Sequence, residues 1–196
     1  INLIDGYALL QNQSDYSNIT ITFIRTAPSA LTETVSTIAS GYFSVQLEDG
    51  IYDITYTIDG FFSESLSDKE IYSNITLSNL TLLERTTLIN VPSLFSTIQE
   101  AVDRASEGDT ILIAEGQYNL NSKISITKNH LTIASNYIFS NDYDDVKNTI
   151  IYGNNDRGIS IDGINNINIS GLTIKNCYDG AIFFRYSNYN TISHCI

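Results

Sequence analysis

The chain has 196 residues, of which 42% are hydrophobic and 16% are charged. Its 22 acidic and 10 basic residues give a net charge of −12, which excludes the basic surface that nucleic-acid phosphates require. No apolar run reaches the ~18 residues of a membrane-spanning helix, and the two cysteines do not indicate a disulfide framework. The abundance of β-branched residues, tyrosine, asparagine and serine predicts an all-β protein.

Residues 1–84 show the two-residue periodicity of half-buried strands. Apolar and polar side chains alternate in residues 19–23, 43–47 and 52–58. Glu48-Asp49-Gly50 stands between two of these runs and predicts a hairpin, because Asp-Gly tolerates the positive φ of a tight turn. About seven short strands fit the segment, at the spacing of a β-sandwich.

Three short motifs in this segment combine glycine with an aromatic residue. They are Gly41-Tyr42-Phe43, Gly50-Ile51-Tyr52 and Gly60-Phe61. With these motifs the segment resembles the carboxypeptidase regulatory-like domain, a small prealbumin-like β-sandwich. The resemblance implies a non-catalytic accessory module of the kind often repeated in secreted proteins. Another seven-stranded sandwich is the alternative.

A short amphipathic helix is expected after a polar joint at residues 84–87. Ser96 is predicted to cap this helix, with Gln99 three residues later completing a capping box. Its apolar face consists of Ile98, Ala101, Val102 and Ala105. Because the helix stands directly before a repeating segment, we expect it to cover the open end of a solenoid.

Apolar triplets separated by Asn, Gly, Asp and Ser make up the rest of the chain. NINISGLTI overlays NTISHCI with Ile169 on Ile192 and Ser170 on Ser193, an offset of 23 residues that is near one coil of a β-helix. LTIAS at residue 131 takes the same role as INISG, 36 residues earlier. We expect the excess to be an inserted polar loop at residues 135–148.

The stretch VPSLFSTIQEAVDRASEGDTILIAEGQY resembles the start of the pectin-lyase-like superfamily, and the repeats after it resemble those of large bacterial surface and secreted proteins. The resemblance implies a right-handed parallel β-helix. The expected fold class is therefore all-β, with a small antiparallel β-sandwich at residues 1–84 followed by the capped start of a right-handed parallel β-helix at residues 89–196. The β-helix is expected to be truncated here and to continue C-terminal to this chain.

Asp142, Asp144 and Asp145 form the densest acidic cluster and lie in the inserted stretch. Carboxylate oxygens suit Ca²⁺, and calcium-dependent lyases of the resembled superfamily use carboxylates. We therefore consider a calcium site at these three residues, with a solvated loop as the alternative. No other cofactor is expected.

Tyr178, Tyr186 and Tyr189 are the candidate ligand-contact residues, because tyrosine rings stack on sugars; the alternative is that they cover the solenoid wall. No catalytic residue is predicted. The N-T-D, G-H-G and R-I-K motifs of the polygalacturonase-like sub-family are absent, and the Asp144-Asp145 pair lacks their flanking context.

Two main functions are compatible with these features. The first is a non-catalytic module of a secreted or cell-surface bacterial protein, in contact with a polysaccharide or cell-surface glycan or in adhesion. The second is the N-terminal fragment of a β-helix polysaccharide lyase or hydrolase whose catalytic coils lie beyond residue 196. A soluble binding protein for a small ligand is a third class, for which the sequence shows no pocket signature.

Overall fold

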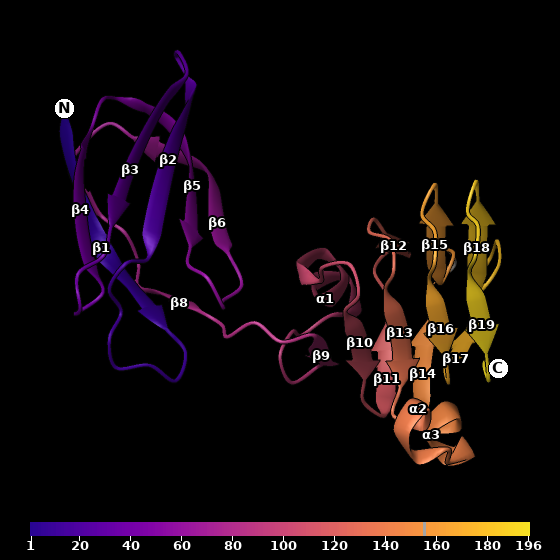
Figure 1. Ribbon diagram of the computed structural model, residues 1–196. Helices are drawn as coiled ribbons and strands as arrows, with labels where there is room; N and C mark the ends of the chain where they lie inside the picture. Colours follow the sequence, from indigo (N-terminus) through magenta and orange to yellow (C-terminus); the bar gives the residue numbers. More distant parts are fainter. Residues whose placement is uncertain (155) are drawn as a thin grey trace. The chain divides into compact units, whose positions relative to one another are not determined.

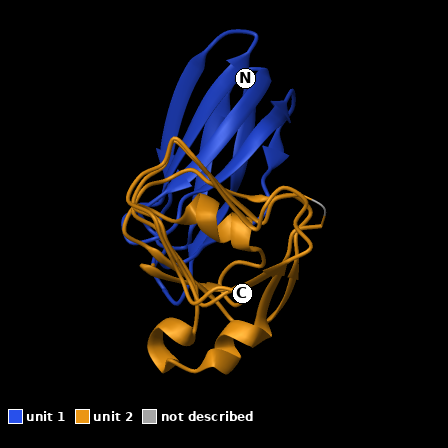
Figure 2. Ribbon diagram, turned by 90° about the vertical axis from the view of Figure 1, so that its right-hand side faces the viewer, with its two compact units in different colours: residues 1–85 blue, residues 86–196 orange. Residues whose placement is uncertain are grey.

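The computed structural model describes residues 1–154 and 156–196. It divides the chain into two compact units, residues 1–85 and residues 86–196 (Figure 2). Both units are built mainly from β-strands (Figure 1). The expected all-β class is confirmed.

Unit 1 consists of two sheets that enclose one core. The first sheet contains β1 (Asn2–Leu10), β4 (Tyr42–Leu47), β7 (Ile75–Thr76) and β8 (Leu80–Leu82). The second contains β2 (Thr20–Ala27), β3 (Leu31–Ser36), β5 (Gly50–Thr57) and β6 (Glu64–Ile71). The second sheet is antiparallel throughout, whereas β1 pairs antiparallel with β4 and parallel with β7 and β8. The arrangement is that of a β-sandwich.

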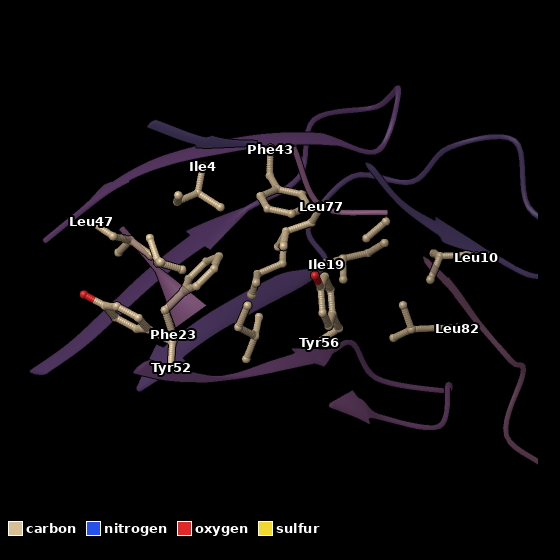
Figure 3. Packing of buried hydrophobic residues seen from close by; sticks show 14 residues of the cluster. Ile4, Leu10, Ile19, Phe23, Phe43, Leu47, Tyr52, Tyr56, Leu77 and Leu82 are labelled. Atoms are coloured by element: carbon tan, nitrogen blue, oxygen red, sulfur yellow. The ribbon is translucent and has the colours of Figure 1, made fainter. Parts of the chain in front are cut away.

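Aromatic rings from both sheets meet in the core of unit 1 (Figure 3). The ring of Phe43 in β4 lies 6.4 Å from that of Phe23 in β2 and 6.1 Å from that of Tyr56 in β5. All three side chains are buried, and such tilted or edge-on pairs add to the free energy of burial itself. Burial also raises the pKa of Tyr56 to about 12, so its hydroxyl stays neutral.

The hairpin predicted at Glu48-Asp49-Gly50 is wrong, because β4 and β5 belong to different sheets. The turn carries the chain across the sandwich. Arg25 contacts this turn: its guanidinium is buried and lies 2.7 Å from the Glu48 carboxylate. A Cβ on Gly50 would stand 2.6 Å from the carbonyl oxygen of Ala27, so this glycine serves close packing between strands.

Unit 2 contains three sheets in which every strand pairs in parallel with its neighbours. The largest consists of β9 (Leu88–Val91), β10 (Thr110–Ile113), β13 (Thr132–Ser135), β16 (Asn168–Ser170) and β19 (Thr191–Ser193). A second consists of β11 (Gly116–Asn119), β14 (Thr149–Tyr152) and β17 (Thr173–Lys175). The third consists of β12 (Ile124–Ile126), β15 (Ile159–Asp162) and β18 (Ile182–Arg185). From β10 onward, the chain visits the three sheets in rotation and adds one strand to each per coil (Figure 1).

The coils stack in the register predicted from the sequence. Ile169 pairs with Ile192 and Ser170 with Ser193, which confirms the 23-residue offset. Ile133 pairs with Ile169 across the longer, 36-residue coil. Ile133 and Ile169 are fully buried, whereas Ile192 in the last coil is 46% exposed. A column of isoleucines therefore forms the interior, and each coil is covered by the next.

Helix α1 (Ile98–Arg104) lies within the outline of the coils when they are viewed end-on (Figure 2). Its predicted apolar face is confirmed as buried. The predicted cap is wrong by one residue: Thr97, not Ser96, accepts a hydrogen bond from the backbone N–H of Glu100. Thr97-x-x-Glu100 is itself a capping-box sequence that overlaps the predicted one, and Gln99 is used elsewhere, in contact with β12.

The inserted stretch was expected to be a loop and is instead two short helices, α2 (Tyr137–Ser140) and α3 (Tyr143–Asn148). Both lie outside the outline of the coils (Figure 2). Asp142 caps α3 by accepting a hydrogen bond from the N–H of Asp144. Acidic residues in the first turn and Lys147 in the last also favour the helix dipole, so a charged stretch without apolar periodicity still forms a helix.

Candidate functional site

The three aspartates of the predicted calcium site have different surroundings. Asp142 is the exposed cap of α3, and Asp144 lies 2.9 Å from the ammonium group of Lys147. Asp145 is only 8% exposed and accepts hydrogen bonds from the Ser140 hydroxyl and the Asn136 amide. The solvated loop proposed as the alternative therefore does not describe Asp145.

The three carboxylates do not form a common ligand set. Across residues 1–154 and 156–196, no group of three or more His, Cys, Asp or Glu side chains is placed to hold one metal ion. Asp144 and Asp145 are consecutive helical residues, so their side chains leave α3 about 100° apart. The structure thus gives each carboxylate its own protein partner.

Tyr178, Tyr186 and Tyr189 lie at corners of the last coil. They are 87%, 84% and 85% exposed. Tyr178 precedes β18, and the other two lie in the turn between β18 and β19, so that β18 separates Tyr178 from Tyr186 and Tyr189. The backbone of Tyr186 and Tyr189 has positive φ, of 52° and 58°. The turns leave most of each ring exposed, and the Tyr186 ring lies 5.8 Å from the Arg185 guanidinium of β18.

An aromatic cluster that the sequence did not indicate joins α2, α3 and the last coil. The ring of Tyr137 lies 5.8 Å from that of Tyr143, edge-on, and 4.7 Å from the imidazole of His194. Tyr137 also packs over Gly171, where a Cβ would come within 2.7 Å of it. Tyr143 remains 46% exposed. The cluster connects the inserted helices to the two coils that follow them, at Gly171 and at His194, and leaves part of the Tyr143 ring in solvent.

Ion pairs connect successive coils on the side of β15 and β18. Arg157 lies 2.5 Å from Asp179, and its guanidinium stacks 3.5 Å above the centre of the Phe183 ring. Arg185 pairs with Asp162 in the register of the two strands. The hydrogen bond from Arg185 holds the pKa of Asp162 below its usual value.

Asp156 has a comparable structural role. It accepts hydrogen bonds from the backbone N–H groups of Arg157 and Lys123. These bonds hold its pKa below the usual value. Asp156, Asp162 and Asp179 thus each join one coil to the next.

None of the helices in the described part of the chain has the length and apolar character that a bilayer-spanning helix needs. The described residues also include both cysteines, Cys177 and Cys195, as free thiols.

Comparisons with known proteins identify no family for this chain. No protein-family model matches it, and no curated protein sequence does. Two solved complexes of type II cohesin with X-dockerin from Acetivibrio cellulolyticus, an N-terminal and a C-terminal interface mutant, are 13% and 14% identical, with TM-scores of 0.37 and 0.38; each match covers 46% of this chain and 68% of the other. The Bacillus anthracis TIE protein is 12% identical with a TM-score of 0.32, and the match covers 50% of this chain and 20% of that one.

Proposed function

We propose that this chain is a non-catalytic module of a secreted or cell-surface bacterial protein and that it contacts glycans. The observation that carries the proposal is the exposure of Tyr178, Tyr186 and Tyr189, each more than four-fifths exposed at the corners of one coil. Exposed apolar rings are unfavourable in water, and a sugar face is a partner that covers them while its hydroxyl groups stay solvated. The polar Asn and Ser side chains around Tyr189 supply hydrogen-bonding groups for such a ligand.

The proposed fold would place the three tyrosines on a surface formed by the turns of successive coils. We infer that unit 1 is a domain of the carboxypeptidase regulatory-like type, residues 1–84, and that unit 2 begins a right-handed parallel β-helix of the pectin-lyase-like type, residues 89–196. The parallel pairing of β10, β13 and β16, the rotation through three sheets and the position of α1 support the second inference. In such a fold, turns at one corner of successive coils form a continuous surface along which an extended polymer can lie.

We propose a non-catalytic role because acidic side chains of unit 2 form ion pairs and hydrogen bonds within the protein. Cleavage of a glycosidic bond needs two carboxyl groups at a defined separation, one of them a proton donor with a raised pKa. Asp162 and Asp179 are instead paired with arginines of the neighbouring coil, and Asp145 is held by Ser140 and Asn136. These acids stabilise the stacking of coils and the insertion.

The test is retention of the chain on a panel of immobilised bacterial-surface and plant polysaccharides. We expect retention on at least one of them, and its loss when Tyr178, Tyr186 and Tyr189 are all replaced by Ala. The matched control is Tyr72→Ala, which removes a tyrosine that is 61% exposed in unit 1. Equal retention of the triple variant and the control would refute the assignment of the site to these rings.

A further inference from the structure

Two arginines lie close to the exposed tyrosines of the last coil. Arg185 precedes Tyr186, and its guanidinium lies 5.8 Å from the centre of that ring. Arg157 lies 2.5 Å from Asp179, the residue that follows Tyr178. A guanidinium group binds a carboxylate through two parallel hydrogen bonds, which makes arginine the side chain best suited to an acidic polymer. The surroundings of these two groups therefore determine which glycans the surface can accept.

Both guanidinium groups are already paired with carboxylates of the protein. Arg157 donates through Nε and Nη2 to Oδ2 of Asp179, at 3.1 and 2.5 Å. Arg185 donates through Nε to Oδ1 of Asp162, at 3.0 Å, and through Nη2 to Oδ2, which is the two-bond geometry that a uronate carboxylate would need. The hydrogen bond from Arg185 holds the pKa of Asp162 below its usual value, so this carboxylate stays charged at pH 7. An acidic ligand must therefore compete with two aspartates.

The net charge of unit 2 also opposes an acidic ligand. Residues 86–196 contain 11 acidic and 7 basic side chains, a net charge of −4. Lys175 is the one other basic residue that follows Arg157, and it lies in β17, in a different sheet from Arg185. A negative surface field lowers the local concentration of a polyanion and slows its association.

The polar groups beside Tyr189 are uncharged. The depression next to this ring is lined by hydroxyl and amide groups and by two partly exposed apolar side chains: Ser187, Asn188, Asn190, Phe184 and Ile192. Asn188 uses its NH₂ group, and Asn190 its carbonyl oxygen, in hydrogen bonds to the preceding coil. The carbonyl of Asn188 and the NH₂ group of Asn190 are then the acceptor and the donor for a ligand. A sugar hydroxyl both donates and accepts, whereas an ionised carboxylate only accepts, so this combination suits hydroxyl groups.

Building on the glycan contact proposed above, we propose that the surface of Tyr178, Tyr186 and Tyr189 takes neutral polysaccharides and discriminates against polymers of uronic acids. The tyrosine rings stack on the faces of the sugars, and Asn188 and Asn190 bind hydroxyl groups. Asp162 and Asp179 determine this specificity, because they occupy the guanidinium groups that would otherwise bind a carboxylate.

The first test compares acidic polymers with their carboxyl-reduced forms, which keep the backbone and lose the charge. The probes are polygalacturonate, alginate and glucuronoxylan, each with its reduced form, and retention of the chain is measured by affinity electrophoresis. We expect at least one reduced polymer to bind about tenfold more tightly than its acidic parent. Equal or tighter binding of the acidic parents would overturn the inference and leave the glycan contact standing. Retention on none of the polymers would refute both.

The second test frees the two arginines and looks for a gain of binding. Asp162→Asn combined with Asp179→Asn leaves the tyrosines in place and should strengthen binding of the acidic parents about tenfold, in a manner weakened by added salt. Each single variant should give about a threefold gain, which keeps the test valid if the double variant fails to fold. Glu107→Gln combined with Glu115→Gln, at two exposed positions of the same unit, is the control with the same change of net charge. Unchanged binding of the acidic polymers by the folded variants, or an equal gain in the control, would overturn the proposal.

Discussion

Gln99 and Ser125 exchange two hydrogen bonds, so that one side-chain amide of α1 reproduces the backbone pairing of a β-strand. The Gln99 carbonyl accepts from the Ser125 N–H at 2.7 Å, and its NH₂ donates to the Ser125 carbonyl at 3.2 Å. Ser125 lies in β12, the first strand of its sheet, whose other neighbour is β15. The helix thereby satisfies the backbone groups at an edge that would otherwise be open to another chain.

The first prediction follows from this contact. Gln99→Ala removes both hydrogen bonds and should lower the free energy of unfolding of unit 2 by about 1–2 kcal/mol. It should also accelerate exchange of the Ser125 amide hydrogen. Gln117→Ala, at an exposed position in β11, is the control and should change stability by less than about 0.5 kcal/mol. A Gln99 variant as stable as the control would show that the edge of β12 needs no cover.

The second prediction separates backbone strain from close packing at two glycines with nearly equal φ, Gly171 at +72° and Gly163 at +69°. A Cβ on Gly171 would lie 2.5 Å from Ser135 Oγ and 2.7 Å from Tyr137 Cβ, whereas nothing lies within 4 Å of one on Gly163. Gly163→Ala should cost about 1 kcal/mol through φ alone, and Gly171→Ala about 2–4 kcal/mol. Urea unfolding followed at amides of unit 2 measures both. Equal losses would mean that the aromatic cluster can move aside.

The third prediction concerns pH. The Arg185 guanidinium holds the folded-state pKa of Asp162 below its usual value. A lowered folded pKa means that the pair stabilises the fold above the unfolded pKa, about 3.9, and that the contribution is lost as pH falls through the folded value. Asp162→Asn should therefore lower the melting temperature at pH 7 and leave it unchanged near pH 2. Arg185→Gln should give the same pattern, and a difference that persists at low pH would contradict it.

The fourth prediction tests calcium at Asp142, Asp144 and Asp145. A bound ion would raise the melting temperature by mass action, and replacing all three residues by Asn would abolish the rise. Because each of these carboxylates has its own protein donor in the structure, we expect no difference in melting temperature between millimolar CaCl₂ and a chelator. A calcium-dependent rise that the triple variant lacks would restore the hypothesis.

The register of the repeating strands could be predicted from the sequence. The offset between Ile169 and Ile192 is visible because each coil needs an inward-pointing apolar residue at the same place. The longer coil between Ile133 and Ile169 was also recognisable, since the polar insertion interrupts a pattern that resumes in the same register.

Other features depend on contacts that no local pattern encodes. The Asp-Gly signal at Gly50 marks a turn but does not say whether the next strand returns to the same sheet. Ser96 and Thr97 both begin capping-box sequences, and the position of β12, which contacts Gln99, favours the second. The sequence predicts Asp145 to be part of an exposed acidic cluster because it does not predict helix α3. In that helix the side chain of Asp145 is buried and points in a different direction from that of Asp144.

The aromatic cluster was missed for a related reason. Tyr137 and His194 are distant in sequence and meet only because the coils bring the end of β19 beside the insertion. Neither residue belongs to a recognisable motif, so the sequence does not indicate that Tyr137 and His194 are in contact.

The most direct test of the central claim is isothermal titration calorimetry of a retained polysaccharide into the intact chain. Binding without chemistry predicts a saturable isotherm whose heat signal returns to the baseline after each injection, and an affinity at least tenfold lower for the Tyr178→Ala, Tyr186→Ala, Tyr189→Ala variant. Tyr72→Ala should behave like the unmodified chain. A sustained heat flow proportional to substrate concentration, lost on changing Asp144 or Arg157, would contradict the account and favour a polysaccharide-cleaving enzyme.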